Sequence, residues 1–425
     1  MTGLGTTYPS AVLRARLLPL HVAVALQGMM LWAPVEKLFM KQIGFTAASV
    51  GLMAAAYAAV TPILEVPSGI LADRWSRRGV LILSAVALSA SSLVGGLSNS
   101  VALYIVSAMI LGVYFAMYSG TVESIVYDVV LEETGASDLY QVRIGRVRLV
   151  ESAALVVSSL AGGWLAGLFG PRLTYFLTVP FAALAILAYL RFQEPRLHKV
   201  GDRVALREHI AVTYRTITRR GPVLPIVVLG ALTALILQVI FEFGPLWLVA
   251  LAAPAVLFGP YWAGLVSTLG IGGLLAGRIQ LGRPATVRVV VTLMVLASVV
   301  LNVSSVVAAV VIAQIVLALL LVTASIHVSA LLHDTVPSSI RAGVASGVST
   351  ISWVGFLPFA LVFGWATRQY GEHASGWMIT AATVVVAVGL IRMSRRQCGP
   401  STGGEGPALE RIPEVPVPVI HPAAA

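Results

Sequence analysis

The stretch G-I-L-A-D-R-W-S-R-R, Gly69 to Arg78, brings one aspartate and three arginines together between two long apolar runs. The run before it covers residues 46–70, and the run after it covers residues 79–97. A helix needs about 20 consecutive, mostly apolar residues to cross a bilayer, and both runs are of that order. The charged stretch therefore reads as a short loop between two membrane-spanning helices.

The same alternation of apolar runs and short polar breaks continues along the chain. Twelve runs are long enough to span a membrane, at about 17–40, 46–70, 79–97, 100–128, 146–169, 173–191, 222–250, 255–277, 284–303, 304–332, 341–366 and 373–392. Of the 425 residues, 58% are hydrophobic and 11% are charged, against about 25% charged in ordinary soluble domains. This composition excludes a water-soluble enzyme, a disordered protein and a fibrous protein. Continuous rather than alternating apolar runs also exclude an outer-membrane barrel, so we predict an all-α polytopic membrane protein.

The basic residues indicate how the helices are oriented. With the N-terminus in the cytoplasm, all but four of the 28 lysines and arginines fall on the cytoplasmic side, the exceptions being Lys37, Lys41, Arg172 and Arg368. The positive-inside rule then predicts that both termini are cytoplasmic, and it supports an even number of spans. The net charge of +10 is thus a signal of topology, with contact to anionic membrane lipid as a secondary role. Nucleic acid is not expected as a partner.

The longest polar stretch divides the spans into two six-helix halves. We predict a cytoplasmic N-terminus (1–16), an N-terminal half (17–192), an arginine-rich central loop with a short amphipathic helix (193–221), a C-terminal half (222–392) and a disordered Pro-, Gly- and Ala-rich tail (393–425). The single cysteine, Cys398, cannot form an intramolecular disulfide or a cysteine metal site. The excess of arginine over lysine and the high alanine content indicate a bacterial protein, and hence the plasma membrane.

The Gly69–Arg78 stretch resembles the signature loop of the major facilitator superfamily, in which glycine, a spacer and Leu-Ala-Asp-Arg precede a basic cluster. It also lies in the expected place, the inner loop after the second helix. A degenerate copy in the second half, G-L-L-A-G-R at Gly273–Arg278, has Gly277 where the first half has Asp73, as in an internally repeated transporter. The resemblance covers about residues 10–395. It implies a secondary active transporter and not an enzyme, and because one bundle is enough for the mechanism we expect a monomer.

The resemblance further implies that this loop is a conformational latch between the halves. Glycine permits close helix approach, and Asp73 can accept hydrogen bonds from the N-terminus of helix eleven, near Arg341. The basic cluster can pair with Asp128 and Glu132 at the inner end of helix four. The expected latch residues are Gly69, Asp73, Arg74, Arg77, Arg78 and Asp128. The alternative is an aspartate that only caps a loop.

Four carboxylates within or beside the spans are candidates for proton coupling, because ionisable groups in a membrane are costly and commonly mark pathways or proton relays. We place Glu123 first and Glu36 second, with Glu65 and Glu151 as further candidates. A pairing with arginine that forms and breaks could load and release a proton. The alternative is a structural charge network with the neighbouring arginines, or, for Glu36, an outer interfacial pair with Lys37 reaching water.

Polar and aromatic residues on the helices that line the cavity in this superfamily are candidates for substrate contact. They are Gln27, Trp32, Tyr114, Tyr118, Gln238 and Glu242. Aromatic rings can stack on planar or cationic substrates, although such residues also form interfacial belts or ordinary packing. Glu242 can alternatively be a hydrogen-bonded residue at a helix break before Gly244-Pro245. His327 is expected to be packing, and no His/Asp/Glu cluster has the spacing of a metal site.

The function that these features favour is proton-coupled export of a small amphipathic drug or metabolite by alternating access. The proton gradient is the expected driving force, with no cofactor, because no phosphate-binding loop with Gly-Lys-Ser/Thr occurs. The candidate cavity is aromatic and acidic, and no basic residue lies near mid-membrane to hold an anionic substrate.

Two hallmarks of drug exporters in the superfamily are absent or degenerate. No arginine stands near Ala108, ahead of Gly112 on helix four, and the stretch S-S-L-A-G-G at 158–163 keeps the paired glycines but lacks Gly-Pro. Proton-coupled import of a nutrient or metabolite is therefore the main alternative. A non-transporting membrane sensor or scaffold and a membrane enzyme are less favoured, the latter because no nucleophile–base pair or metal constellation occurs.

Overall fold

The computed structural model describes residues 8–135, 139–195, 223–276, 278–279, 281–335 and 341–397. The described part of the chain is built from helices, and twelve helical segments are long and apolar enough to cross a membrane. The N-terminal helices are α1 (Tyr8–Gly28), the 3-10 helix η1 (Ala33–Val35), α2 (Glu36–Gln42), α3 (Ala47–Arg74), α4 (Arg77–Leu97), α5 (Val101–Thr134), α6 (Tyr140–Phe169) and α7 (Pro171–Arg191). The C-terminal helices are α9 (Val223–Phe243), α10 (Pro245–Ala250), α11 (Ala255–Ala276), α12 (Pro284–Val303), α13 (Val307–Thr335), α14 (Arg341–Tyr370) and α15 (Glu372–Gln397). The predicted all-α fold with twelve spans is confirmed.

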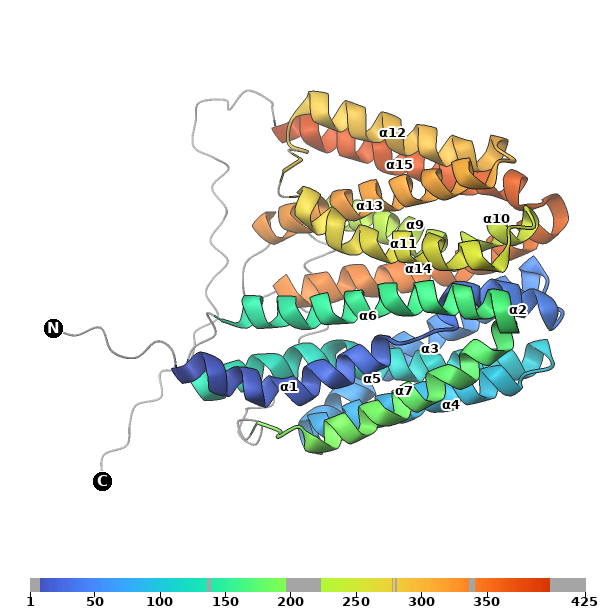
Figure 1. Ribbon diagram of the computed structural model, residues 1–425. Helices are drawn as coiled ribbons and strands as arrows, with labels where there is room; N and C mark the ends of the chain where they lie inside the picture. The colour runs from blue at the N-terminus through green and yellow to red at the C-terminus, as the bar shows by residue number, and fades with distance from the viewer. Residues whose placement is uncertain are drawn as a thin grey trace, which may run out of the picture.

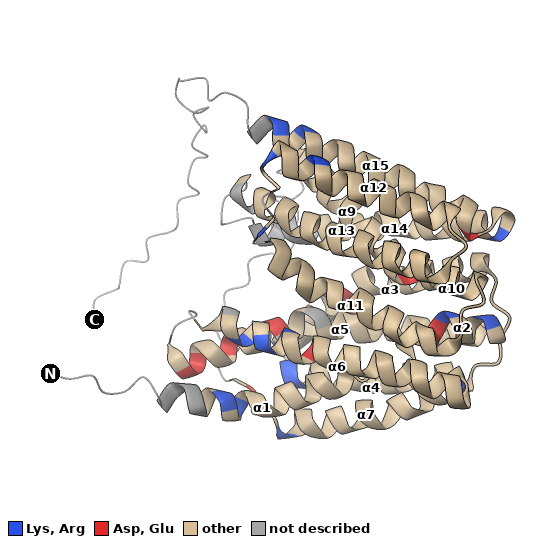
Figure 2. Ribbon diagram, turned by 45° about the horizontal axis from the view of Figure 1, so that its top comes forward, with Lys and Arg blue, Asp and Glu red and all other residues tan. Residues whose placement is uncertain are grey.

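The spans form two bundles that lie side by side (Figure 1), with α1–α7 in one and α9–α15 in the other. The start of α1 and the end of α15 lie at the same end of the molecule. Figure 2 shows that most of the Lys and Arg residues in the described helices lie toward this end. We call it the basic end and the opposite one the far end. That the basic end faces the cytoplasm stays a prediction, and most of the predicted central loop and tail lies outside the described residues.

The first and seventh spans are each broken near the far end. The sequence predicted one uninterrupted run over 17–40, whereas within 222–250 a helix break before Gly244-Pro245 was one of the two alternatives for Glu242. In the first span, α1 ends at Gly28 and the chain passes through η1 into α2. In the seventh, α9 gives way to α10 at Gly244. Pro245 interrupts the seventh span, because it cannot donate a backbone hydrogen bond, whereas α1 already ends at Gly28, ahead of Pro34 in η1. In contrast, the boundary predicted between the runs 284–303 and 304–332 is confirmed, since α12 ends at Val303 and α13 begins at Val307.

Side chains from neighbouring helices satisfy the backbone groups that the breaks set free, as a membrane requires. The Leu31 amide donates to the Thr178 hydroxyl at 3.1 Å. The Gln314 side-chain amide donates to the Gly244 carbonyl at 3.2 Å. The two breaks are therefore ordered parts of the fold and hold the far thirds of both spans in fixed positions.

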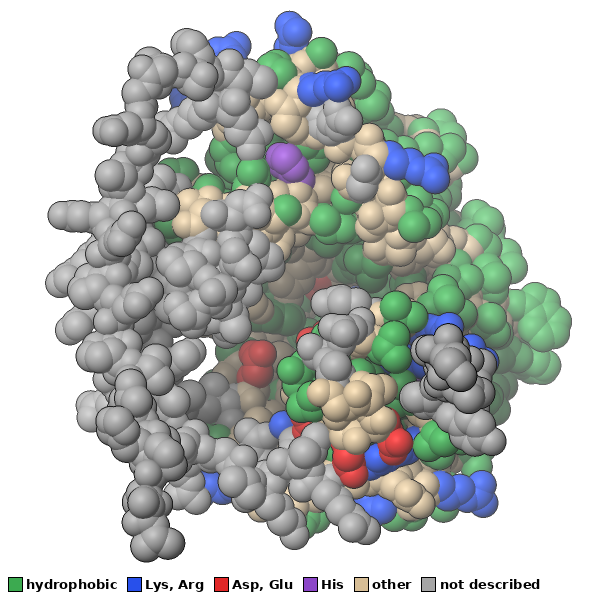
Figure 3. All heavy atoms as spheres, turned by 90° about the vertical axis from the view of Figure 1, so that its left-hand side faces the viewer, with side chains coloured by type: hydrophobic (Ala, Val, Ile, Leu, Met, Phe, Trp, Pro, Cys, Tyr) green, Lys and Arg blue, Asp and Glu red, His purple; other side chains and the backbone are tan. Residues whose placement is uncertain are grey.

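The two halves meet through backbone contacts near the far end. A methyl group at Gly51 of α3 would lie 2.4 Å from the Ala360 carbonyl oxygen of α14, and one at Gly163 of α6 would lie 2.5 Å from the Gly259 nitrogen of α11. Viewed onto the basic end, the surface is hollowed between the halves, with acidic side chains visible inside (Figure 3). The structure is therefore closed at the far end and open at the basic end.

Candidate functional site

A buried ion cluster joins the two halves near the far end, between α2 and the end of α9. The Lys37 ammonium on α2 lies 2.8 Å from a carboxylate oxygen of Glu36 and 2.5 Å from one of Glu242 on α9. The lysine side chain is only 2% exposed, and the two carboxylates are 16% and 20% exposed. Lysine is almost never so deeply buried unless it is paired. The Glu36–Lys37 pair is thus present, but it reaches across to the other half instead of extending into water.

Two tyrosines complete this cluster on the side of the N-terminal half. The Tyr104 hydroxyl donates to the second oxygen of Glu36 at 3.0 Å, and it lies 2.6 Å from the Tyr175 hydroxyl. Both rings are buried. Glu36 is therefore held by groups of its own half on both oxygens, whereas Glu242 depends on a cation from the opposite half.

The helix breaks bring the charges of this cluster together. Glu36 and Lys37 open the short helix α2 directly after η1, and Glu242 lies in the last turn of α9, just before the break at Gly244. The breaks also place Gly244 in tight packing, since a methyl group there would lie 2.4 Å from the Tyr261 hydroxyl and 2.5 Å from the Gln314 oxygen. The sequence analysis anticipated a break at Gly244-Pro245 but not the partner of Glu242.

Gln27 and Trp32 face the interior of the N-terminal half. The Gln27 amide donates to Ser84 at 3.2 Å and accepts a hydrogen bond from Tyr189. The Trp32 indole donates to Ser92 at 3.2 Å, and its ring stacks on Tyr175 with 5.3 Å between the centroids. These contacts hold α1 and its break against α4 and α7. Their predicted contact with substrate stays a prediction.

A second charge cluster lies in the basic half of the bundle. Arg148 of α6 bonds Glu123 of α5 at 2.7 Å and Glu151 of its own helix at 2.9 Å. Arg148 and Glu123 are about half exposed. This arrangement matches the structural network named as the alternative for Glu123 and Glu151, so their predicted role in coupling rests on whether the pairs separate during transport.

The predicted tyrosine pair on α5 is buried. Tyr114 and Tyr118 stack with 5.4 Å between their centroids, and the buried Tyr118 hydroxyl has no hydrogen-bond partner among the residues that the structure describes. Gln238 on α9 is partly exposed. Contact of Tyr114, Tyr118 and Gln238 with substrate stays a prediction.

The signature loop contains the pair that the resemblance implied. The Arg77 guanidinium bonds Asp128 at 2.7 Å, and both side chains are largely buried. Among the described residues, no atom lies within 4 Å of a methyl group placed at Gly69, so its predicted role in close helix approach stays a prediction. Gly69 and Glu65 line a cavity of about 150 Å³ between α3 and α5. Arg74 is exposed, and the Asp73 side chain lies outside the part that the structure describes.

Glu194 anchors the start of α4, a role that the sequence analysis missed. Its carboxylate accepts hydrogen bonds from the Ser76 hydroxyl at 2.6 Å and from the Arg77 backbone N–H at 2.5 Å. The Arg78 guanidinium donates to the Phe192 carbonyl at 3.2 Å. A carboxylate at a helix N-terminus is favourable because the backbone N–H groups there are free and the dipole is positive. The only available signal was an acid shortly after the sixth span.

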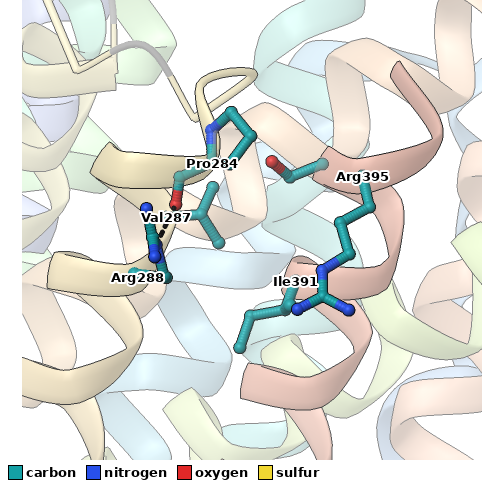
Figure 4. A pocket seen from close by; sticks show the side chains of 6 residues that line it. Pro284, Val287, Arg288, Ile391 and Arg395 are labelled. Atoms are coloured by element: carbon teal, nitrogen blue, oxygen red, sulfur yellow. Dashed lines mark hydrogen bonds between the residues drawn. The ribbon is translucent and has the colours of Figure 1, made fainter. Parts of the chain in front are cut away.

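A further pocket lies away from the hollow, between α12 and α15 near the basic end (Figure 4). Its volume is about 240 Å³, and its lining residues are Pro284, Val287, Arg288, Ile391, Ser394 and Arg395. The Arg288 guanidinium donates to the Pro284 carbonyl at 3.4 Å. The pocket belongs to one half alone and does not connect the two charge clusters described above.

Comparison with known proteins decides the family. A family model described as Major Facilitator Superfamily matches residues 17–356. The chain belongs to the major facilitator superfamily. It is therefore a membrane transporter of small molecules and not an enzyme.

Curated relatives that match the chain are multidrug resistance proteins of Bacillus subtilis (strain 168). Multidrug resistance protein 2 is 28% identical over 190 residues, which is 44% of this chain and 46% of the relative. Multidrug resistance protein 1 is 26% identical over 185 residues, or 43% of this chain and 46% of the relative. Each match spans about half the length of the relative.

Solved structures share the fold at low identity. The nucleoside transporter NupG has a TM-score of 0.73 at 14% identity, covering 88% of this chain and 98% of NupG. A bacterial homologue of the human lysosomal transporter Spinster, in an inward-facing and occupied conformation, has a TM-score of 0.72 at 15% identity, covering 93% and 98%. A D-xylose–proton symporter has a TM-score of 0.66 at 12% identity, covering 88% and 97%. These likenesses support the superfamily fold.

Proposed function

We propose that this transporter exports small amphipathic drugs or metabolites in exchange for protons by alternating access, as a monomer. The observation that carries the proposal is an acidic hollow between the halves, open at the basic end and closed at the far end by contacts between the halves. The partial likeness to two multidrug resistance proteins supports export. With the basic end in the cytoplasm of a bacterial cell, this conformation is the one that loads substrate from inside.

The charges of the site support a cationic or neutral substrate. The Glu123–Arg148–Glu151 cluster contains two carboxylates and one guanidinium, so it carries one negative charge in excess when all three are ionised. A positively charged substrate can balance that charge. An anionic substrate would meet repulsion at the same place.

Efflux from cells expressing the protein tests the proposal. Cells are loaded with cationic and neutral dyes and antibiotics, and retention is followed with and without a protonophore. We expect protonophore-sensitive clearance that slows about tenfold in Asp73→Asn, because a hydrogen bond to a charged group contributes about 1.5 kcal/mol or more. Glu123→Gln tests the predicted coupling site, and Glu372→Gln, at the far end of α15, is a matched control.

Three other results would each contradict a part of this proposal. Clearance no faster than in empty cells across the panel would refute broad drug export. Proton-dependent accumulation of a nutrient or metabolite would establish the importer alternative. A clearance rate that is unchanged by the protonophore would refute coupling to the proton gradient.

A further inference from the structure

We propose that Glu242 is the proton-binding carboxylate of the transport cycle, and that Lys37 is a tethered cation that takes the place of the proton whenever the far end closes. This inference rests on the proposed proton-coupled alternating access and names its coupling site. The carboxylates that the sequence favours for coupling, Glu123, Glu36, Glu65 and Glu151, all belong to the N-terminal half, whereas Glu242 belongs to the C-terminal half.

The position of the pair between the halves is the first argument. Lys37 belongs to the N-terminal half and Glu242 to the C-terminal half, with 2.5 Å between their charged atoms. Every other ion pair recorded between described side chains joins two residues of the N-terminal half. Separation of the two halves would therefore take Lys37, the cation paired with Glu242, away from it.

The surroundings of Glu242 make Lys37 its decisive partner. The charged groups acting on it are Lys37 and Glu36 of α2, and the Tyr57 phenol of α3 lies within range of both carboxylates. Tyr104 of α5 and Tyr175 of α7 are engaged with Glu36 and with each other.

The elements of the C-terminal half that pack around the break present mostly neutral or occupied groups. Tyr261 of α11 donates to Gln314 of α13, and α14 contributes phenylalanine rings around Phe243. His373 of α15 is bonded to the Leu301 carbonyl at 2.9 Å. Lys37 is therefore the cation that neutralises Glu242 in this conformation.

Opening the far end would change the distance to Lys37 for only one of the two carboxylates. Lys37 stays beside Glu36, its neighbour in the chain, while Glu242 loses its cation and meets the medium at the far side. A carboxylate without a nearby cation binds a proton more readily than one that is paired. When the far end closes again, the carboxyl O–H bond breaks, the proton passes to water in the hollow and the Lys37 ammonium takes its place. One proton thus moves from the far side to the basic side in each cycle.

The sign of the pH response follows from linkage. In the wild type, protons bind better to the far-open state, so acid favours opening. In Lys37→Met, closure buries two carboxylates with no cation, so protons bind better to the far-closed state and acid favours closure. Reversal of the pH response by one uncharged substitution distinguishes this mechanism from general acid sensitivity.

Spin labels on the purified full-length protein test this directly. With Cys398→Ser, labels at Gln42 on α2 and Tyr370 at the end of α14, both exposed far-end residues, report the distance between the halves. From pH 8 to pH 4 we expect the ratio of far-open to far-closed protein to rise about threefold, since an unpaired glutamate is half protonated only near pH 4.3 and pairing with a cation keeps its proton affinity at least about tenfold lower. We expect the change to vanish in Glu242→Gln and to reverse in Lys37→Met.

Matched controls are Lys41→Met on the same short helix and Glu372→Gln, both of which should respond like the wild type. A wild-type response in Glu242→Gln would overturn the proposal, and so would unchanged direction in Lys37→Met. Glu242→Gln leaves Lys37 paired with Glu36, so it decides the question even when Lys37→Met does not fold. The assay needs no substrate. Failure of dye clearance with an intact pH response would refute export alone.

Discussion

Replacing Gly163 with alanine is expected to hold the far end open and to reduce transport strongly, while the protein stays folded. The new methyl group would lie 2.5 Å from the Gly259 nitrogen and 2.6 Å from its Cα atom, and backbone atoms cannot turn aside as a side chain can. Because α6 and α11 belong to different halves, parting the halves relieves the overlap without unfolding either one. Overpacking of this kind costs about 1–3 kcal/mol, which changes the closed-to-open ratio by about tenfold to a hundredfold.

The far-end label distance at neutral pH measures this effect, and dye clearance measures its consequence. Gly167→Ala is a close control on the same helix, because its methyl group would meet Val256 at an ordinary 3.8 Å. A Gly163→Ala protein with the wild-type distance and wild-type clearance would refute the inference that backbone contact closes the far end.

Gly162→Ala, one residue earlier, is expected to damage folding rather than shift the conformation. Its methyl group would lie 1.9 Å from the Leu31 carbonyl oxygen, in the break of the first span. Leu31 belongs to the same half and is held through its amide by Thr178, so movement between the halves brings no relief. We expect a loss of about 3 kcal/mol in the free energy of unfolding.

Thermal unfolding of the detergent-purified protein checks this prediction. Gly162→Ala should lower the midpoint and the yield, whereas Gly163→Ala should leave both close to wild type. Equal midpoints for Gly162→Ala and the wild type would show that the first-span break tolerates displacement.

Most of the fold could be predicted from the sequence because its signals are local. Span length, charge asymmetry and proline or glycine at the ends depend on neighbouring residues only, and they predicted the twelve spans and the boundary between the ninth and tenth. The Arg77–Asp128 pair was predicted from the signature loop and its place in the fold. The break in the first span was missed because one apolar run covers both α1 and α2.

The far-end cluster could not be predicted because its members are distant in the chain. Lys37 and Glu242 are separated by 205 positions, and a lysine beside a glutamate at the end of an apolar run reads as an interfacial pair. Only the packing of two broken helices against each other shows that the lysine is buried. Tyr104 likewise carries no local sign that it will bind Glu36.

Glycine contacts at the far end also bear on how fast the protein can turn over. Interlocked side chains must change rotamers before two helices separate, and close packing makes such rearrangement slow. At Gly51–Gly364 and Gly163–Gly259 the touching atoms belong largely to the backbone. Few side chains must therefore change rotamer before these helices separate. The activation barrier for opening then falls mainly on the Lys37–Glu242 pair, and a single proton can serve as its trigger.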